Sequence, residues 1–410
     1  MSNLKKIEGG VTTPQGFTAG AVYTAIKKRE NKKPDVAVLY SDLPCSCAAC
    51  FTTNKFCAAP VILDREILKK GKARAVVINS GNANAATGKQ GIEDARTVER
   101  EAEKLLGLGE DEVFVCSTGV IGQRLPVDKV LQGIREIIPA KLAKENGSEA
   151  AYAIMTTDTV RKECAYELQL STGTVKIGAM AKGSGMIHPN MATMLVFITT
   201  DCAISPAMLQ KALSTDIANT FNMVSVDGDT STNDMVTVLA NGLAGNAEIT
   251  AEGKDFTAFM QALNTVTVYL CRCIAGDGEG ATKLLECKVS GAATLDIAKT
   301  VAKSVICSSL TKAAMFGADA NWGRVLCAIG YSGAPVDVGR IDVQFASKAG
   351  TILVCKDGAG VDFSEEEAKK ILLESEIEIL IDLHSGSAVS TAWGCDLTYD
   401  YVKINGDYRT

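Results

Sequence analysis

Alternating strand-like and helix-like segments predict a mixed α/β fold for this chain of 410 residues. Three short runs rich in β-branched residues, at 35–40, 74–79 and 112–116, have the composition of buried strands. Between and after them, 92–107 and 127–140 carry apolar residues at helical spacing among charged ones, which is typical of amphipathic helices that cover a sheet. The first half is therefore expected to be a sheet with helices packed on it.

The second half continues this alternation. Strand-like runs lie at 195–198 and 235–239, and 376–383 alternates in part, as a half-exposed strand does. Ser364 and Glu367 have the spacing of a capping box, so a helix is predicted to begin after Ser364. Further helices are expected near 205–219, 253–273 and 293–304.

The charge pattern indicates small-molecule partners and argues against nucleic acid and membrane. The formal net charge is -6, and the longest basic run, 69–72, is too short to follow a phosphate backbone. No apolar run is long enough to cross a bilayer, and the N-terminus shows no signal-peptide pattern. The 14 cysteines are scattered through a large chain, which fits a reducing compartment. A cytoplasmic protein is therefore expected.

Four closely spaced cysteines, Cys45, Cys47, Cys50 and Cys57, could be read as a metal site. Their spacing, C-x-C-x2-C-x6-C, matches no common zinc or iron–sulfur pattern, and they lie in an apolar, strand-like run. Free cysteine packs readily as a small apolar side chain. Packing is the favoured interpretation, and no metal and no cofactor are expected.

Only two histidines, His188 and His384, are present, which limits the ways in which a nucleophile can be activated. His384 falls in a strand-end turn and is expected at the surface or in packing, whereas His188 lies five residues before Thr193. A threonine hydroxyl can instead use its own α-amine as a base, since that amine has a reference pKa of about 7.7–8.0. Thr193 could gain such an amine only by cleavage of the backbone before it.

The run from Ala181 to Leu195, AKGSGMIHPNMATML, closely resembles the self-cleavage motif of the ornithine acetyltransferases, a bifunctional family of arginine biosynthesis. Read without the family, the glycine pair at 183–185 could be a phosphate loop and Thr193 a plain strand residue. The resemblance implies cleavage between Ala192 and Thr193. The products would be an alpha fragment, 1–192, and a beta fragment, 193–410, with Thr193 as its N-terminal nucleophile.

Further motifs extend the resemblance over nearly the whole chain, at 10–17, 79–88, 321–324 and 391–399. Ala86 stands where many family members have cysteine, and Ala320 stands where proline is usual. Trp322 and Trp393 fall within two of these motifs, and both are expected to anchor the core. The resemblance also implies a two-layer fold of mixed sheets and helices, with the two fragments intertwined and the active site between them.

Residues 117–122 follow a predicted strand and resemble the oxyanion segment of the family. Attack on an acetyl amide builds negative charge on oxygen, which donors already in place must stabilise. The resemblance implies that the Thr118 hydroxyl and the Gly119 backbone N–H are those donors. Read alone, the segment would be a turn from a strand into a helix.

The resemblance further implies a substrate pocket that holds both signs of charge. Lys182 would pair with a carboxylate and Glu279 would face the ornithine ammonium group, although as single residues both would be read as solvated charges. The implied substrate-binding residues are Thr156, Lys182, Thr193, Glu279, Asn405 and Thr410.

The segment 225–234 stacks acids and hydroxyls as a calcium or magnesium loop does. It lacks the closing glutamate of an EF-hand, so a hydrogen-bonded loop near the site is the favoured interpretation.

The implied activity is a ping-pong acetyl transfer, in which Thr193 takes acetyl from N-acetylornithine and passes it to glutamate. Some family members also accept acetyl from acetyl-CoA, which would be a substrate here and not a cofactor. The implied assembly is a heterotetramer of two alpha and two beta fragments. Two other readings remain open: an N-terminal-threonine amidohydrolase or aminopeptidase, and an uncleaved, non-catalytic amino-acid-binding protein.

Overall fold

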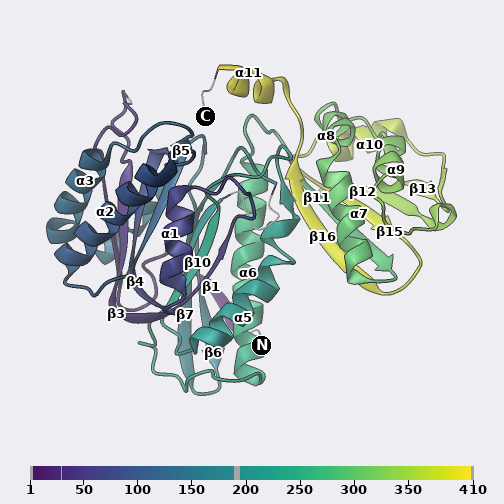
Figure 1. Cartoon of the computed structure of the whole chain (residues 1–410). Helices are drawn as coiled ribbons and strands as arrows, with labels where there is room; N and C mark the ends of the chain where they lie inside the picture. Colours follow the sequence, from purple (N-terminus) through teal and green to yellow (C-terminus); the bar gives the residue numbers. More distant parts are fainter. Residues whose placement is uncertain (1–2, 29, 189–193, 408–410) are drawn as a thin grey trace.

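Two mixed β-sheets and the helices that cover them make up the computed structural model, which describes residues 3–28, 30–188 and 194–407 (Figure 1). The α/β class predicted from the sequence is confirmed. No helix in these three ranges is long and apolar enough to span a membrane.

The first sheet contains strands from both sides of residue 193. Its order is β1-β6-β7-β8-β10-β3-β4-β5, with β2 paired to β3. The strands that follow residue 193, β8 and β10, pair in parallel at its centre, flanked by β7 and β3. The strands are β1 (Leu4–Ile7), β2 (Phe17–Val22), β3 (Val36–Phe51), β4 (Lys72–Asn82), β5 (Val113–Val120), β6 (Lys162–Leu170), β7 (Gly173–Lys182), β8 (Leu195–Thr200) and β10 (Met235–Ala240).

The second sheet is built from the later part of the chain. Its order is β14-β13-β12-β15-β11-β16-β9, with β11 parallel to β15 and antiparallel to β16. The strands are β9 (Val224–Ser225), β11 (Leu284–Ala292), β12 (Asp342–Ser347), β13 (Gly350–Lys356), β14 (Ala359–Gly360), β15 (Glu376–Asp382) and β16 (Ala388–Cys395).

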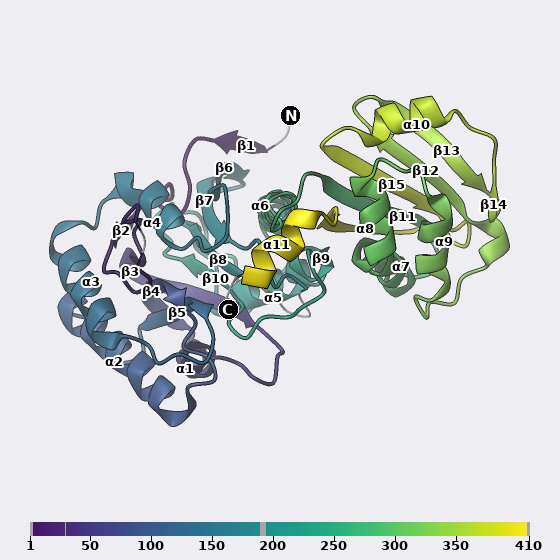
Figure 2. The ribbon, with the colours of Figure 1, turned by 90° about the horizontal axis from the view of Figure 1, so that it is seen from above.

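Helices cover the sheets and join them. The helices α1 to α4 pack on one face of the first sheet, and α5 and α6 pack on the other (Figure 2). Since α6 also contacts β11 and β16, it lies between the two sheets, while α7 covers the far face of the second sheet. The helices are α1 (Ala59–Leu68), α2 (Gly88–Leu106), α3 (Val127–Ala140), α4 (Gly147–Ala153), α5 (Pro206–Ile217), α6 (Lys254–Gly276), α7 (Leu295–Cys307), α8 (Ser309–Phe316), α9 (Trp322–Gly330), α10 (Glu365–Leu372) and α11 (Tyr399–Asp407), with short 3-10 turns at Lys144–Asn146, Phe221–Met223 and Val338–Arg340.

The helix predicted after Ser364 is capped as the sequence indicates. The Ser364 hydroxyl accepts a hydrogen bond from the Glu367 backbone N–H at 3.2 Å, and α10 begins at the next residue, Glu365. This bond satisfies one of the N–H groups that a helix start leaves without a partner.

The long strand β3 holds most of the cysteine cluster. Cys45, Cys47 and Cys50 are buried in it, and Cys57 is half-buried in the turn that follows. Burial raises the thiol pKa of Cys45 and of Cys47 to about 12, so both stay protonated. The packing interpretation is confirmed for these buried cysteines.

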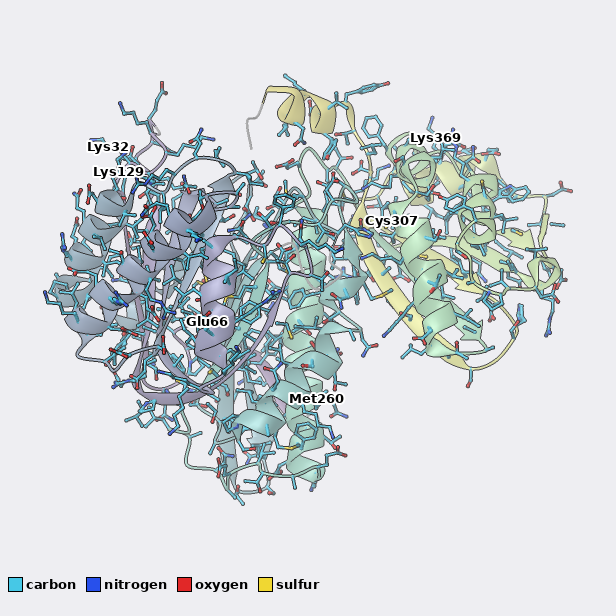
Figure 3. The ribbon with its side chains drawn as sticks, in the orientation of Figure 1. Lys32, Glu66, Lys129, Met260, Cys307 and Lys369 are labelled. Carbon is cyan, nitrogen blue, oxygen red and sulfur yellow. The ribbon has the colours of Figure 1, made fainter. Side chains whose placement is uncertain are left out.

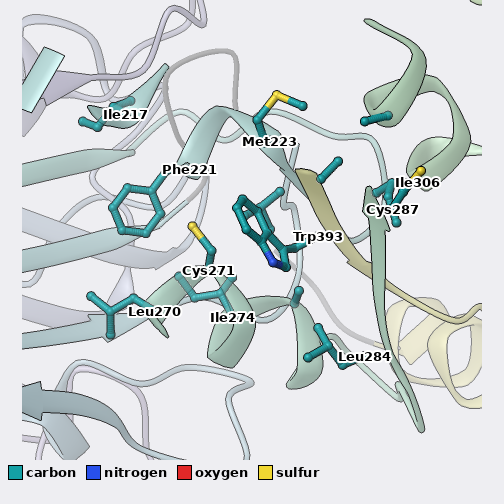
Figure 4. Packing of buried hydrophobic residues seen from close by; sticks show 14 of the residues in the cluster. Ile217, Phe221, Met223, Leu270, Cys271, Ile274, Leu284, Cys287, Ile306 and Trp393 are labelled. Atoms are coloured by element: carbon teal, nitrogen blue, oxygen red, sulfur yellow. The ribbon is translucent and has the colours of Figure 1, made fainter. Parts of the chain in front are cut away.

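Trp393 anchors the junction between α6 and the second sheet. Its side chain is 5% exposed and lies beside Phe221, Cys271 and Ile274 (Figure 4). Trp322, the other tryptophan, is half-buried and packs against the same core. Both were predicted to pack, and both do.

Replacement of Trp393 by alanine is expected to lower the free energy of unfolding by about 3–5 kcal/mol, because it removes a large buried side chain and leaves a cavity. Urea unfolding followed by far-UV circular dichroism measures this loss. Leu373→Ala is the control, since that side chain is 63% exposed and its loss should change stability by less than about 0.5 kcal/mol. Equal losses for the two variants would contradict the anchoring role.

Candidate active site

A cavity of about 260 Å³ lies where β7 ends and β8 begins. It collects every assigned site residue that the structure describes, from well-separated parts of the chain: Thr118, Gly119, Thr156, Lys182, Glu279 and Asn405. The remaining assigned residues, Ala192, Thr193 and Thr410, lie outside the described residues. Met194 and Leu195, which follow Thr193 in the sequence, both line the cavity.

The segment predicted to bind an oxyanion requires a glycine for steric reasons. Gly119 has φ +134°, a conformation that side chains disfavour, and an added Cβ would lie 2.4 Å from the Gly81 carbonyl carbon. This close approach leaves the Gly119 backbone beside the cavity without a side chain over it. Thr118, half-buried, lines the same wall.

Buried amides hold this segment in place. Ser117 donates its hydroxyl hydrogen to Asn79 Oδ1 at 2.6 Å, and Asn79 Nδ2 donates to the Asn82 carbonyl at 2.9 Å. Asn233 Nδ2 donates to the carbonyls of Ala83 at 2.6 Å and Ser117 at 2.8 Å. The asparagine-rich turn and the polar loop 225–234 therefore both support the wall that carries Thr118, which confirms that this loop is hydrogen-bonded and lies near the site.

Lys182 supplies the cationic side of the cavity. It ends β7, is 8% exposed, and its Nζ lies 4.0 Å from Asp158 Oδ2. Burial raises the pKa of Asp158, but the positive charges of Lys182 and Lys162 lower it by more than burial raises it. The pKa of Asp158 therefore lies below its usual range. Asp158 is therefore an ionised carboxylate between two ammonium groups.

Glu279 supplies the acidic side. Its Oε2 accepts a hydrogen bond from Asn405 Nδ2 at 2.8 Å, and its backbone N–H donates to the Ser184 carbonyl at 3.1 Å. Gly185 leaves room for this carboxylate, since an added Cβ there would lie 2.3 Å from the Glu279 carboxyl carbon and would displace the side chain. Asp227 adds a second acid to the lining, and it accepts hydrogen bonds from the backbone N–H groups that follow Gly185.

Asp234 lines the cavity but was not predicted as a site residue. It precedes β10, whose first residue, Met235, donates its N–H to the Met194 carbonyl at 3.0 Å. The side chain is buried, and its Oδ2 has no hydrogen-bond partner among the described residues. Burial raises the pKa of this carboxyl well above its usual range, and the nearby Lys182 only partly offsets the shift.

No histidine lines the cavity within the described part of the chain. His188 Nδ1 lies 3.0 Å from Ser225 Oγ and 3.5 Å from Sγ of Cys307, the last residue of α7 (Figure 3). Burial, with a smaller contribution from Lys303, lowers the His188 pKa to about 4. His384 is exposed, as expected, and its Nε2 lies 2.9 Å from Asp342 Oδ2.

The model of the ArgJ family matches residues 18–410. The chain belongs to the ArgJ family. It is 54% identical over 407 residues to the arginine biosynthesis bifunctional protein ArgJ of Symbiobacterium thermophilum, which covers 99% of this chain and 100% of that protein. The ArgJ protein of Caldanaerobacter subterraneus is 50% identical with the same coverage.

A solved ArgJ structure gives the same fold over part of the chain. The crystal structure of the arginine biosynthesis bifunctional protein ArgJ from Bacillus halodurans is 50% identical, with a TM-score of 0.51. It covers 53% of this chain and 100% of its own chain.

Sequence reasoning missed three buried acids and one lysine around this ArgJ-family pocket: Asp158, Asp234, Asp277 and Lys162. Asp158 lies two residues after Thr156 and Asp277 two residues before Glu279, so proximity to assigned residues was a signal for both. Asp158 lies four residues before Lys162, but the other carboxylate that pairs with this lysine, Asp277, lies 115 residues away, so the local sequence does not mark Lys162 as buried.

Proposed function

We propose that this protein transfers acetyl from N-acetylornithine to glutamate through an ester on Thr193, after the chain cleaves itself between Ala192 and Thr193. The observation that carries the proposal is one cavity in an ArgJ-family chain. Its lining combines the segment proposed to bind an oxyanion with a lysine and a glutamate, and it includes Met194, the residue after Thr193. Arginine biosynthesis is the pathway named for its relatives.

The two signs of charge fit the proposed substrates. Both amino acids carry an α-carboxylate, for which Lys182 is the cation in the lining, while Glu279 suits the side-chain ammonium of ornithine. The same pocket can then accept glutamate after ornithine leaves, which is what a ping-pong reaction requires.

In the proposed chemistry the base is the α-amine of the nucleophilic residue itself. The α-amine of Thr193 takes the proton as the hydroxyl attacks the acetyl carbon, and the amine of ornithine leaves with that proton. Negative charge on the carbonyl oxygen is stabilised by the Thr118 hydroxyl and the Gly119 N–H. The absence of a histidine from the described lining supports a base of this kind.

The length of the solved relative supports the proposed cleavage. The Bacillus halodurans chain corresponds to 53% of this chain, whereas the Symbiobacterium thermophilum protein corresponds to 99% of it. A beta fragment covering 193–410 would make up the same 53% of 410 residues.

The active unit in this proposal is a cytoplasmic heterotetramer of two alpha and two beta fragments. Acetyl-CoA is proposed as a second acetyl donor, since the relatives are named bifunctional.

The purified protein is expected to run on a denaturing gel as two bands of about 20 and 23 kDa, which divide 43.1 kDa in proportion to fragments 1–192 and 193–410. Thr193→Ala should give one band, because it lacks the attacking hydroxyl, and Thr193→Ser should still give two. Active enzyme whose only N-terminus is Met1 or Ser2 would rule out the α-amine base.

Replacement of Thr118 by alanine should lower kcat by about 10- to 1,000-fold, with a smaller change in KM, because an oxyanion donor acts mainly in the transition state. Steady-state assays with N-acetylornithine and glutamate measure this split. Thr157→Ala is a matched control, since Thr157 lines the cavity without an assigned role. Unchanged kcat in Thr118→Ala would remove this residue from the site.

Mature enzyme incubated with N-acetylornithine alone should gain the mass of one acetyl group on the fragment that begins at Thr193. Glutamate should then release it as N-acetylglutamate, with parallel double-reciprocal lines. Mass spectrometry of the intact fragments follows both steps. Release by water as fast as by glutamate would favour an amidohydrolase, and failure to label an uncleaved chain would favour a binding protein. The same assay with acetyl-CoA tests the second donor.

A further inference from the structure

A wholly buried lysine lies behind the cavity without lining it. Lys162, the first residue of β6, has no exposed side-chain surface. Its Nζ lies 2.7 Å from Asp158 Oδ1 and 2.5 Å from Asp277 Oδ2. A buried ammonium group is unfavourable unless it is paired, and here two carboxylates meet it.

Asp158 is shared between two lysines. Besides the contact with Lys162, Oδ1 accepts a hydrogen bond from the Gly183 N–H at 2.7 Å, and Oδ2 accepts one from the Thr156 N–H at 3.0 Å. The Lys182 ammonium group lies 4.0 Å from Oδ2, beyond direct hydrogen-bonding distance. Asp158 is thus bonded to the buried lysine and only close to the one that lines the cavity.

Asp277 connects the same lysine to the acidic side of the cavity. Its carboxylate accepts hydrogen bonds from the backbone N–H of Thr159 and from the hydroxyl of that residue. Its carbonyl accepts the Ser184 hydroxyl at 2.6 Å, and the Ser184 carbonyl accepts the Glu279 N–H at 3.1 Å. Lys162 therefore joins the segment before Glu279 to the segment that follows Lys182.

We propose that Lys162 is a positioning residue that forms an ion pair with Asp158 and thereby keeps Lys182 available for a substrate carboxylate. The inference rests on the proposed function, in which Lys182 binds that carboxylate. Attraction between charges rises as they approach, so a carboxylate that loses one of two neighbouring cations is drawn to the other. Without Lys162, Asp158 pairs with Lys182 directly, and a substrate must compete with a fixed carboxylate.

The first test is Lys162→Met in the cleaved enzyme. KM for N-acetylornithine and for glutamate should rise by about 10- to 100-fold, the range that corresponds to one hydrogen bond to a charged group. The kcat should change much less, because Thr118 and Gly119 do not contact Lys162. A fall in kcat with unchanged KM would overturn the proposal.

Two double variants with equal net charge separate positioning from stability. Lys162→Met with Asp158→Asn, and Lys162→Met with Asp277→Asn, each remove one buried cation and one buried anion, which avoids an unbalanced charge. Only the first removes the carboxylate that competes for Lys182, so only the first should restore KM toward the wild-type value. Equal KM values in the two would overturn the proposal. Thermal unfolding shows whether Lys162→Met folds. If it does not, the KM values of the two double variants alone test the proposal.

Lys182→Met shows which hypothesis has failed. If it leaves KM unchanged for both substrates, Lys182 does not bind their carboxylates, and the pocket assignment in the proposed function is wrong. If it raises KM while Lys162→Met does not, the positioning role is wrong and the proposed function stands.

Discussion

The pairing of β8 and β10 at the centre of the first sheet is the constraint on which the rest of the structure depends. β7 and β3, which precede residue 193, hold this pair from both sides through complete ladders. A break in the backbone just before β8 would leave both ladders intact, together with the buried side chains on either face of the sheet. The fold can therefore place a new chain end beside a cavity without giving up its core.

The same ladders place the charges of the pocket. Lys182 pairs with Leu195 across the β7–β8 ladder, so strand register, and not a loop, fixes the cation beside the start of β8. Asp234 comes just before β10, next to Met194. The cation and the buried acid thus hold their positions through backbone pairing, which is stiffer than contacts between side chains alone.

Local patterns predicted most of the elements, and long-range pairing accounts for what they missed. The helix expected at 127–140 is α3 with the same bounds, but the strand expected at 35–40 extends to Phe51 as β3. Pro44 breaks the strand pattern there, and the register with β4 shifts between Tyr40 and Cys45, where a bulge tolerates a missing N–H.

The assigned pocket residues that the structure describes all line one cavity. Buried Lys162 was missed because one of its partners lies 115 residues away, and a lysine at a strand start reads as exposed.

The second sheet reaches the acidic side of the pocket beside Glu279. β16 ends at Cys395, and the next residue, Asp396, accepts hydrogen bonds from the N–H groups of Thr282 at 2.9 Å and Lys283 at 3.0 Å, just after Glu279 in the sequence. The chain then enters α11, where Asn405 donates to Glu279 at 2.8 Å. Glu279 is therefore fixed from both sides by segments that flank neighbouring strands, β11 and β16. The acidic side of the pocket depends on the second sheet, whereas the cationic side is held within the first, and the ion pairs of Lys162 connect the two.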